Sequence, residues 1–241
     1  MNVGIILAAG SGTRVGAGTP KQFIEVLGRP VLAYALQAYQ RAPEIDAIQV
    51  VCRREWAAKV RDIARDAGVT KLRWVTEGGD SCPDSIRRAV FALRGDLSGD
   101  DQVAVHMAVS PLTTGEDIAR ALRVCREKGC CFTMHPVNVC LARGGGDGFA
   151  DTDAPKERFV ELNVPWAFNY GRLYDLYRRL DDSGRTLGVN DYTLGLWLAA
   201  GNRAWYVRGS DAGRLKITTA HDLELFEGYL LYRARHGGER P

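Results

Sequence analysis

The chain of 241 residues contains no apolar stretch close to 18 residues, the length at which a membrane-spanning helix becomes possible. Its N-terminus lacks the basic region and the small-residue cleavage site of a secretory signal peptide. The formal net charge is only +3 and the basic residues are dispersed, so the sequence indicates no nucleic-acid-binding face. We therefore expect a cytoplasmic protein that binds neither a membrane nor a nucleic acid.

The cysteines show no Cys-x-x-Cys spacing, and a cytosolic chain of this size needs no disulfide. We therefore expect buried thiols at most of these positions. Cys82 and Cys140 are exceptions, because they fall in segments that the motifs below assign to a binding site. The full set is Cys52, Cys82, Cys125, Cys130, Cys131 and Cys140.

Apolar runs of strand length alternate with amphipathic stretches of helix length along most of the chain. This alternation predicts βαβ units and a mostly parallel sheet, within a single α/β domain spanning residues 1–241. The hydrophobic content of 46% is sufficient for one sizeable core. The predicted strands lie at residues 3–8, 47–52, 72–76, 102–106, 131–136 and 204–208. The predicted helices lie at residues 31–42, 54–67, 84–94, 115–128, 170–182 and 190–201, with a last one from about residue 220.

The first predicted strand runs directly into a glycine-rich loop. Residues 3–9 read Val-Gly-Ile-Ile-Leu-Ala-Ala, and residues 10–23 continue Gly-Ser-Gly-Thr-Arg-Val-Gly-Ala-Gly-Thr-Pro-Lys-Gln-Phe. A buried strand that ends in such a loop presents backbone N–H groups to a phosphate chain. The loop also carries two cations, Arg14 and Lys21, seven residues apart. Together these features predict a site for a nucleoside triphosphate.

Two common phosphate-binding motifs do not match this loop. A P-loop ends in Gly-Lys-Ser or Gly-Lys-Thr, and neither tripeptide occurs in the chain. A dinucleotide fingerprint requires Gly-x-Gly-x-x-Gly, and Gly10, Gly12 and Gly16 miss that spacing by one residue. An ordinary glycine-rich turn is the remaining alternative, but such a turn requires neither the two cations nor the Pro-Lys-Gln sequence.

The loop and three later segments resemble one family of nucleotidyltransferases. Leu-Ala-Ala-Gly-Ser-Gly-Thr-Arg-Val-Gly, Pro-Lys-Gln-Phe and Leu27–Leu32 resemble the opening of the 2-C-methyl-D-erythritol 4-phosphate cytidylyltransferases and of the related ribitol 5-phosphate cytidylyltransferases. The later segments resemble the family more weakly. They are Gly78-Gly79 with Asp84-Ser85, Val105-His106 with Pro111-Leu112, and Lys216–Thr219 with Asp222-Leu223.

The resemblance implies a Rossmann-like α/β fold and a homodimer whose subunits exchange contacts through a projecting β-arm. It implies transfer of CMP from CTP to a polyol phosphate, or to a related phosphate or phosphonate, with release of pyrophosphate and with Mg²⁺ as cofactor. In the methylerythritol enzymes this reaction belongs to isoprenoid biosynthesis. The arm would span residues 138–164, where Arg143–Pro155 is too polar and glycine-rich for the core and is also compatible with a disordered loop.

The acceptor in such a reaction is already an anionic nucleophile, so catalysis requires alignment and stabilisation of charge rather than a general base. Arg14, Lys21 and Lys216 match the family's cations and are the predicted catalytic residues. Lys216 precedes a predicted helix that Thr219 and Asp222 would cap. The residues predicted to bind the nucleotide are Ala8, Ala9, Gly10, Gly12, Thr13, Gly79, Asp80 and Ser85.

Two of the matching segments contain residues with a competing structural interpretation. Ser85, like its neighbour Asp84, is also well placed to cap a helix that begins there. His106 follows a strand, but the reaction needs no general base, so a packed histidine is the preferred interpretation.

The resemblance fails at several positions near the expected metal and acceptor. Met107 stands where the family has the aspartate that binds Mg²⁺, and Ser110 and Cys82 stand where arginines are usual. A thioether is a poor ligand for a hard cation, so the metal ligands are left unassigned. Residues 163–166, Asn-Val-Pro-Trp, replace the usual Gln-Thr-Pro-Gln.

The resemblance also implies a set of acceptor-binding residues. Cys140 takes the place of a threonine, and Lys156 takes the place of an arginine that binds the acceptor phosphate. Asn190-Asp191 aligns with an acidic pair near the acceptor pocket, and Asp191 is the predicted acceptor residue of the two. The substitutions leave two interpretations open: an enzyme with another acceptor, or a nucleotide-binding homologue with weak or no catalysis and a regulatory or assembly role. A transferase that prefers another nucleoside triphosphate is a third.

Overall fold

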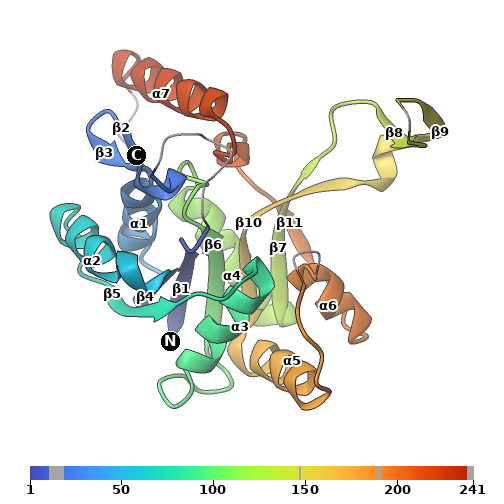
Figure 1. Cartoon of the computed structure of the whole chain (residues 1–241), viewed down its shortest axis with the longest axis horizontal. Coiled ribbons are helices and arrows are strands. Elements are labelled where there is room, and N and C mark those ends of the chain that lie inside the picture. The colour runs from blue at the N-terminus through green and yellow to red at the C-terminus, as the bar shows by residue number, and fades with distance from the viewer. Residues whose placement is uncertain (11–18, 147, 189–190, 238–241) are drawn as a thin grey trace.

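A twisted sheet of seven strands forms the middle of the molecule in the computed structural model (Figure 1). The structure describes residues 1–10, 19–146, 148–188 and 191–237. The strand order is β11-β7-β10-β6-β1-β4-β5. In chain order these strands are β1 (Asn2–Leu7), β4 (Ala47–Cys52), β5 (Leu72–Glu77), β6 (Gln102–Met107), β7 (Cys130–Pro136), β10 (Val160–Asn169) and β11 (Tyr206–Arg208).

The continuous apolar runs become the inner strands, because a parallel strand with neighbours on both sides is covered on both faces. β1 pairs in parallel with β4 and β6, and Val3, Ile5 and Ile6 are fully buried. β10 pairs antiparallel with β6 and β7, whereas the other strand pairs of this sheet are parallel. The prediction of a mostly parallel α/β sheet is confirmed.

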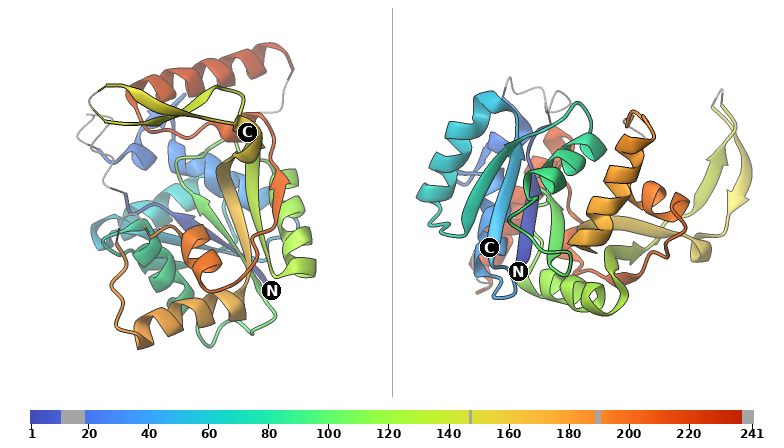
Figure 2. Two further views of the ribbon diagram at one scale, coloured as in Figure 1. Left: turned by 90° about the vertical axis from the view of Figure 1, so that its right-hand side faces the viewer. Right: turned by 90° about the horizontal axis from the view of Figure 1, so that it is seen from below.

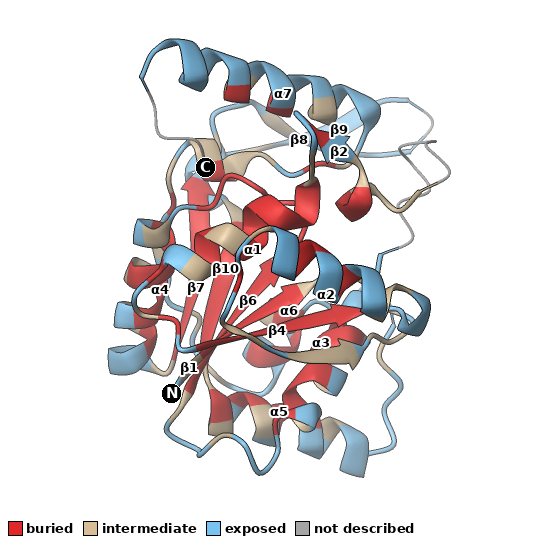
Figure 3. Ribbon diagram, turned by 90° about the vertical axis from the view of Figure 1, so that its left-hand side faces the viewer, coloured by how far each residue is buried: buried red, intermediate tan, exposed pale blue. Residues whose placement is uncertain are grey.

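Helices cover both faces of the sheet and bury their apolar sides against it (Figures 2 and 3). One face is covered by α1 (Val31–Arg41), α2 (Ala57–Asp66) and α4 (Gly115–Lys128). The other is covered by α3 (Cys82–Ala92), α5 (Tyr170–Asp182) and α6 (Thr193–Ala199). A third, smaller cluster joins α7 (Ala220–Arg235) to Tyr34 and to β2 (Glu25–Val26), which pairs with β3 (Arg29–Pro30). The short 3₁₀ turns are η2 (Lys21–Phe23), η3 (Arg54–Trp56), η4 (Lys156–Arg158) and η5 (Ala212–Arg214).

The strand β10 was not among the predicted strands. Its sequence contains Pro165 and the polar residue Asn163, and proline within a run argues against a central strand because it cannot donate to the ladder. The structure accommodates the proline with an irregularity: the register against β7 shifts between Asn163 and Trp166. Trp166 and Phe168 then continue the strand and are buried.

The polar segment after β7 forms an antiparallel hairpin of β8 (Leu141–Gly144) and β9 (Ala150–Ala154) that projects away from the sheet (Figures 1 and 2). Most of its residues are exposed. Arg143 bridges the two strands by an ion pair with Asp151 at 3.0 Å. The described part of residues 138–164 therefore contains a hairpin and not only a loop, and its role in a homodimer stays a prediction.

Two further expectations concern burial and membranes. Cys52, Cys125, Cys130 and Cys131 are buried free thiols, whereas Cys82 and Cys140 are exposed, as expected from the sequence. None of the described helices is both long enough and apolar enough to span a membrane.

His106 is a core histidine whose titration should contribute strongly to the pH dependence of stability, beside the smaller contribution of His135, which is also buried and has a lowered pKa. His106 in β6 is fully buried, and its Nε2 lies 3.0 Å from the carbonyl oxygen of Ser110. Burial lowers the pKa of His106 to about 4, from an ordinary value of 6.5. The unfolded chain therefore binds an extra proton between these two pH values, so the contribution is complete above pH 6.5 and is lost as the pH falls to about 4.

We predict that the free energy of unfolding falls by about 3 kcal/mol less between pH 7 and pH 4 in His106→Gln than in the wild type. A tenfold change in proton affinity corresponds to about 1.4 kcal/mol. Glutamine keeps a donor for the Ser110 carbonyl but does not titrate. The free energy of unfolding in urea at pH 7 and pH 4 measures the difference. Equal pH dependence in the wild type and the variant would show that His106 is not neutral in the fold.

Candidate nucleotide-binding site

The carboxyl ends of four neighbouring parallel strands, β6, β1, β4 and β5, lie along one end of the sheet, where α/β folds bind ligands. Beyond the strand ends the pairing continues through single backbone hydrogen bonds. Ala8 N donates to Val51 O at 2.7 Å, Gly78 N to Cys52 O at 2.9 Å, and Ala108 N to Leu7 O at 3.0 Å. The first, second and third motif segments are therefore held side by side.

The predicted base-binding residues lie together and are mostly backbone. A Cβ atom placed on Gly78 would come 2.5 Å from the Cβ of Ala9, so the two segments touch there. The Gly79 amide donates to Ser85 Oγ at 3.0 Å. A Cβ atom on Gly79 would lie 1.8 Å from a carboxylate oxygen of Asp84, so a side chain at this position would clash unless Asp84 moved. Ala8 is buried, Ala9 is half-buried, and Gly10 and Asp80 are exposed. Gly12, Thr13 and Arg14 lie outside the described residues.

The helix that follows is capped by a different residue from those expected. Ser81 is the N-cap of α3, and its side chain accepts a hydrogen bond from the Asp84 amide. The expectation that Asp84 or Ser85 fills this position is therefore wrong by three or four residues. Ser85 instead lies one turn into the helix, where its hydroxyl is turned to Gly79. Asp84 pairs with Arg87 at 2.7 Å and with Arg88 at 3.1 Å.

Gln22 is a site residue that the sequence analysis did not single out, although it belongs to the Pro-Lys-Gln-Phe motif. Its side chain is buried, and Nε2 donates to Ala8 O at 2.6 Å and to Gly10 O at 3.0 Å. The residue after it, Phe23, packs on Trp56 with ring centroids 5.0 Å apart. Gln22 therefore ties η2 to the end of β1, so the two described ends of the glycine-rich loop are held together.

The two described cations of the predicted catalytic set are brought to the same place. Lys21 Nζ donates to Ile217 O at 2.9 Å, which joins the first motif segment to the last. Lys216, the residue before Ile217, is exposed. Its positive charge is close enough to Cys82, at the start of α3, to affect the pKa of that thiol. Desolvation raises the pKa of the Cys82 thiol, and Lys216 offsets part of that rise.

The segment that carries Lys216 is followed by a capped helix, as expected. The Thr219 side chain accepts from the Asp222 amide, and the Asp222 side chain accepts from Thr219 N at 2.7 Å, which is a capping box. Asp222 also accepts from Thr218 N at 2.8 Å. Burial alone would raise the pKa of Asp222, but these hydrogen bonds outweigh it and lower the pKa.

The carboxyl end of β6 does not fit the Mg²⁺ site that the resemblance implies. Met107 is half-buried and packs against two apolar clusters, and Ser110 is 1% exposed. Among the described residues, no three His, Cys, Asp or Glu side chains are grouped in a way that could hold a metal ion. Residues 11–18 read Ser-Gly-Thr-Arg-Val-Gly-Ala-Gly and contain no carboxylate. His106 is not available as a base or a ligand, because it is buried in the core.

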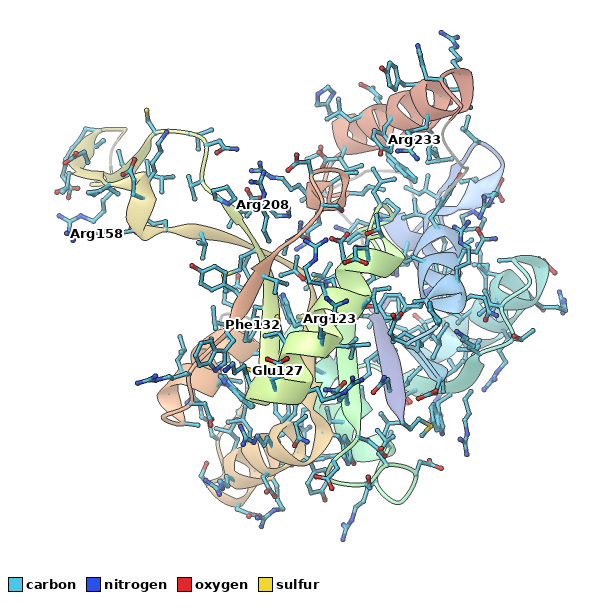
Figure 4. All side chains as sticks on the ribbon, turned by 180° about the vertical axis from the view of Figure 1, so that it is seen from behind. Arg123, Glu127, Phe132, Arg158, Arg208 and Arg233 are labelled. Carbon is cyan, nitrogen blue, oxygen red and sulfur yellow. The ribbon has the colours of Figure 1, made fainter. Side chains whose placement is uncertain are left out.

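The predicted acceptor residues are not part of this cluster within one chain. Cys140 directly precedes β8 and Lys156 lies in η4, and both are exposed on the projecting hairpin. Figure 4 shows Arg158, the last residue of η4, far out on the hairpin. Asp191 lies elsewhere, beside α6, where it pairs with Arg185 at 2.5 Å and accepts from Gly188 N at 2.7 Å. Arg185 and Asp191 lie on the wall of a cavity of about 320 Å³ with Leu162, Tyr192 and Leu198.

The family of the chain is shown by comparison with known proteins. The family model of IspD, 2-C-methyl-D-erythritol 4-phosphate cytidylyltransferase, matches residues 2–232. The chain belongs to this family. A ribitol-5-phosphate cytidylyltransferase of Lacticaseibacillus paracasei is 30% identical over 95% of this chain and 98% of its own. A 2-C-methyl-D-erythritol 4-phosphate cytidylyltransferase of Acidobacterium capsulatum is 32% identical over 97% of this chain and 99% of its own.

Solved structures agree with the fold. The crystal structure of 4-diphosphocytidyl-2C-methyl-D-erythritol synthase from Anaerococcus prevotii has a TM-score of 0.79 to this chain at 24% identity, and the match covers 96% of each chain. The Rossmann-like α/β fold expected from the resemblance to IspD is therefore confirmed. The members of this family are nucleotidyltransferases that use CTP and a phosphorylated polyol.

The role of Gln22 can be tested by replacing its side-chain amide, whose Nε2 donates two hydrogen bonds, with a carboxylate, which only accepts them. In Gln22→Glu a carboxylate would face the carbonyl oxygens of Ala8 and Gly10, so both hydrogen bonds are lost and like partial charges meet. We expect a loss of about 2 kcal/mol in the free energy of unfolding, the usual cost of leaving buried polar groups unpaired. Urea denaturation measures it.

Gln40→Glu is the matched control. The Gln40 Oε1 accepts from Thr70 N and Lys71 N, and a carboxylate can still accept both. Gln40 Nε2 donates to Thr70 Oγ1 at 3.0 Å, and this hydroxyl can donate to a carboxylate instead. A stability loss as large as that of Gln22→Glu would contradict a special role for Gln22.

Proposed function

We propose that this chain transfers CMP from CTP to the phosphate of a five-carbon polyol phosphate, of the kind named for its relatives, ribitol 5-phosphate or 2-C-methyl-D-erythritol 4-phosphate. The observation that carries the proposal is the contact between Lys21 Nζ and Ile217 O. This contact joins Lys21 to the residue that follows Lys216, and Gln22 joins the same turn to the strand end where Ala9 and Gly78 touch.

The reaction requires alignment and charge, and the site offers these. An oxygen of the acceptor phosphate attacks the α-phosphorus of CTP, the bond between the α-phosphorus and its bridging oxygen breaks, and pyrophosphate leaves. Since the acceptor is already an anion, no proton needs to be removed. Lys21 and Lys216 would stabilise the negative charge that develops on the α-phosphoryl oxygens and the leaving group, together with Arg14.

Binding of the cytidine would use the small residues at the strand ends. Ala8, Ala9 and Gly79 leave space for a planar ring, and the neighbouring Asp80 is exposed and accessible to a ribose. The loop residues Gly10, Gly12 and Thr13 would offer backbone N–H groups to the phosphates.

The acceptor side would be completed by a second copy of the chain. Lys156 and Cys140 lie on the projecting hairpin, so they reach a nucleotide site only if that site belongs to a neighbouring subunit. A homodimer through the hairpin satisfies this requirement. Lys156 would then bind the acceptor phosphate, and Asp191 would lie near the polyol.

The rival function, binding without turnover, receives no support from the two relatives described above, both of which are named as enzymes. Release of pyrophosphate from CTP with a panel of polyol phosphates separates the two. Measurable binding of CTP without release with any acceptor would favour the rival. Faster release from ATP, GTP or UTP than from CTP would assign another nucleotide.

We predict that Lys21→Ala and Lys216→Ala each lower the rate of pyrophosphate release by about a hundredfold or more, because loss of one preorganised donor to a developing oxyanion costs about 3 kcal/mol. Lys128→Ala is the control, since Lys128 lies at the end of α4 over the ring of Trp205. Unchanged rates in the two site variants would refute their assignment.

The metal dependence should also differ from that of a site with a carboxylate. Because Met107 offers no oxygen ligand, we expect Mg²⁺ to add little to the thermal stabilisation of the wild type by CTP. In Met107→Asp we expect Mg²⁺ to increase the thermal stabilisation by CTP, by an amount equivalent to about a tenfold lower Kd for CTP. Met107→Leu is the matched control. A wild-type shift that requires the ion would show that other ligands replace the aspartate.

A further inference from the structure

The segment between β11 and α7 carries Lys216 and the carbonyl that binds Lys21, yet it belongs to no long helix or strand. We propose that Asp117, in the first turn of α4, is a positioning residue that fixes this segment through Ser210 and so presents Lys216 to the nucleotide. This inference rests on the proposed function and adds to it a residue that lies outside the nucleotide site. Figure 4 shows the chain as it leaves β11 at Arg208, beside α4, where Arg120 Nη1 donates to Arg208 O at 2.7 Å.

Asp117 is buried, and both of its carboxylate oxygens have partners. Oδ1 accepts from Ser210 N at 2.7 Å. Oδ2 accepts from Ser210 Oγ at 2.6 Å, from Thr114 Oγ1 at 2.8 Å and from Thr114 N at 3.1 Å. Burial would raise the pKa of this carboxyl, but the hydrogen bonds from Ser210 and Thr114 outweigh it and lower the pKa. The group is therefore a carboxylate at neutral pH.

A helix cap explains only half of these contacts. Asp117 and Thr114 form a capping box, which stabilises the start of α4. The two contacts from Ser210 come from a residue 93 positions later in the chain and contribute nothing to the cap. The same carboxylate therefore serves two purposes: it closes the helix through Thr114, and it binds the end of β11 through Ser210.

Four anchors hold the segment between Ser210 and Ile217, and one of them is the ion pair of Arg214 with Glu161. Ser210 is bound by Asp117, and its Oγ in turn accepts from Gly213 N at 3.3 Å. Gly213 O accepts from Asn163 Nδ2 at 2.8 Å. Ile217 is fully buried, and its amide donates to Val109 O at 2.8 Å.

Lys216 and Lys21 depend on the last of these anchors. Lys216 directly precedes Ile217, and Lys21 Nζ is bound to the Ile217 carbonyl. Gly209 N donates to Met134 O at 3.2 Å, so release of Ser210 frees the stretch between Gly209 and Gly213, and we expect the direction in which the chain arrives at Lys216 to change. Small displacements of a positioned charge have large effects on rate, since a shift of about 1 Å can cost about a hundredfold.

Ser210→Ala and Thr114→Ala form a matched pair, because each removes one hydroxyl from the same carboxylate oxygen. We expect Thr114→Ala to lower stability at least as much as Ser210→Ala while its kcat stays within about twofold of the wild type. Ser210→Ala should lower kcat by about tenfold or more, and Ser210→Thr, which restores a hydroxyl, should recover most of it.

A double-mutant cycle shows whether the effect passes through Lys216. In the Lys216→Ala background, Ser210→Ala should cause no further loss of kcat, because the group that it positions is gone. Equal kcat in Ser210→Ala and Thr114→Ala, or independent losses in the cycle, would overturn the proposal.

Hydrogen exchange separates this inference from the proposed function. The amide of Ile217 should exchange faster in Ser210→Ala and at the wild-type rate in Thr114→Ala. If the wild type releases no pyrophosphate with any acceptor, the proposed function fails, and the exchange of Ile217 still decides whether Asp117 fixes the segment. Unchanged exchange in Ser210→Ala would refute the positioning role whatever the activity.

Discussion

A hydrogen bond from the Lys21 ammonium to the carbonyl oxygen of Ile217 closes the candidate site, because it joins two segments 196 residues apart in sequence. The parallel sheet alone brings the first three motif segments together, since the carboxyl ends of β1, β5 and β6 lie along the same end of the sheet. The fourth segment follows β11, at the far edge of the sheet, and crosses to the site as an irregular stretch. The fold therefore supplies most of the site from strand topology and the remainder from long-range contacts with backbone carbonyls.

Three carboxylates near the candidate site have partners other than the two lysines. Asp84 is bound to Arg87 and Arg88, Asp222 is used by the cap of α7, and Asp117 is bound to Ser210. Asp84 is therefore paired with arginine side chains, whereas Asp222 and Asp117 accept hydrogen bonds from backbone amides and hydroxyls. A cationic surface of this kind is suited to a polyanion whose charge moves from one oxygen to another during the reaction, because fixed charges need no reorganisation at that moment.

Sequence patterns predicted the parts of the fold that depend on local periodicity. The parallel strands and the helices were found because each is a single apolar run or one amphipathic stretch, whereas β10 was missed because Pro165 and Asn163 interrupt its pattern. Ala8, Ala9, Gly79 and Ser85 were assigned by resemblance, and they lie together because residues after parallel strands meet at one end of the sheet. Their role in binding a nucleotide stays a prediction. Gln22 and Asp117 could not be identified in the same way, because their roles rest on side-chain contacts with backbone distant in sequence, which leave no periodic signal.

The departures from the IspD family on the acceptor side are structural as well as chemical. Asn163 and Trp166 are buried, and Trp166 Nε1 donates to Asn163 O at 2.6 Å. Asn163 Nδ2 donates to Gly213 O, three residues before Lys216. The residues that replace Gln-Thr-Pro-Gln thus help to hold the segment that carries a predicted catalytic cation. The resemblance implies that residues 163–166 lie on the acceptor side, and Asn163 is then the residue through which a change on that side would reach the segment of Lys216.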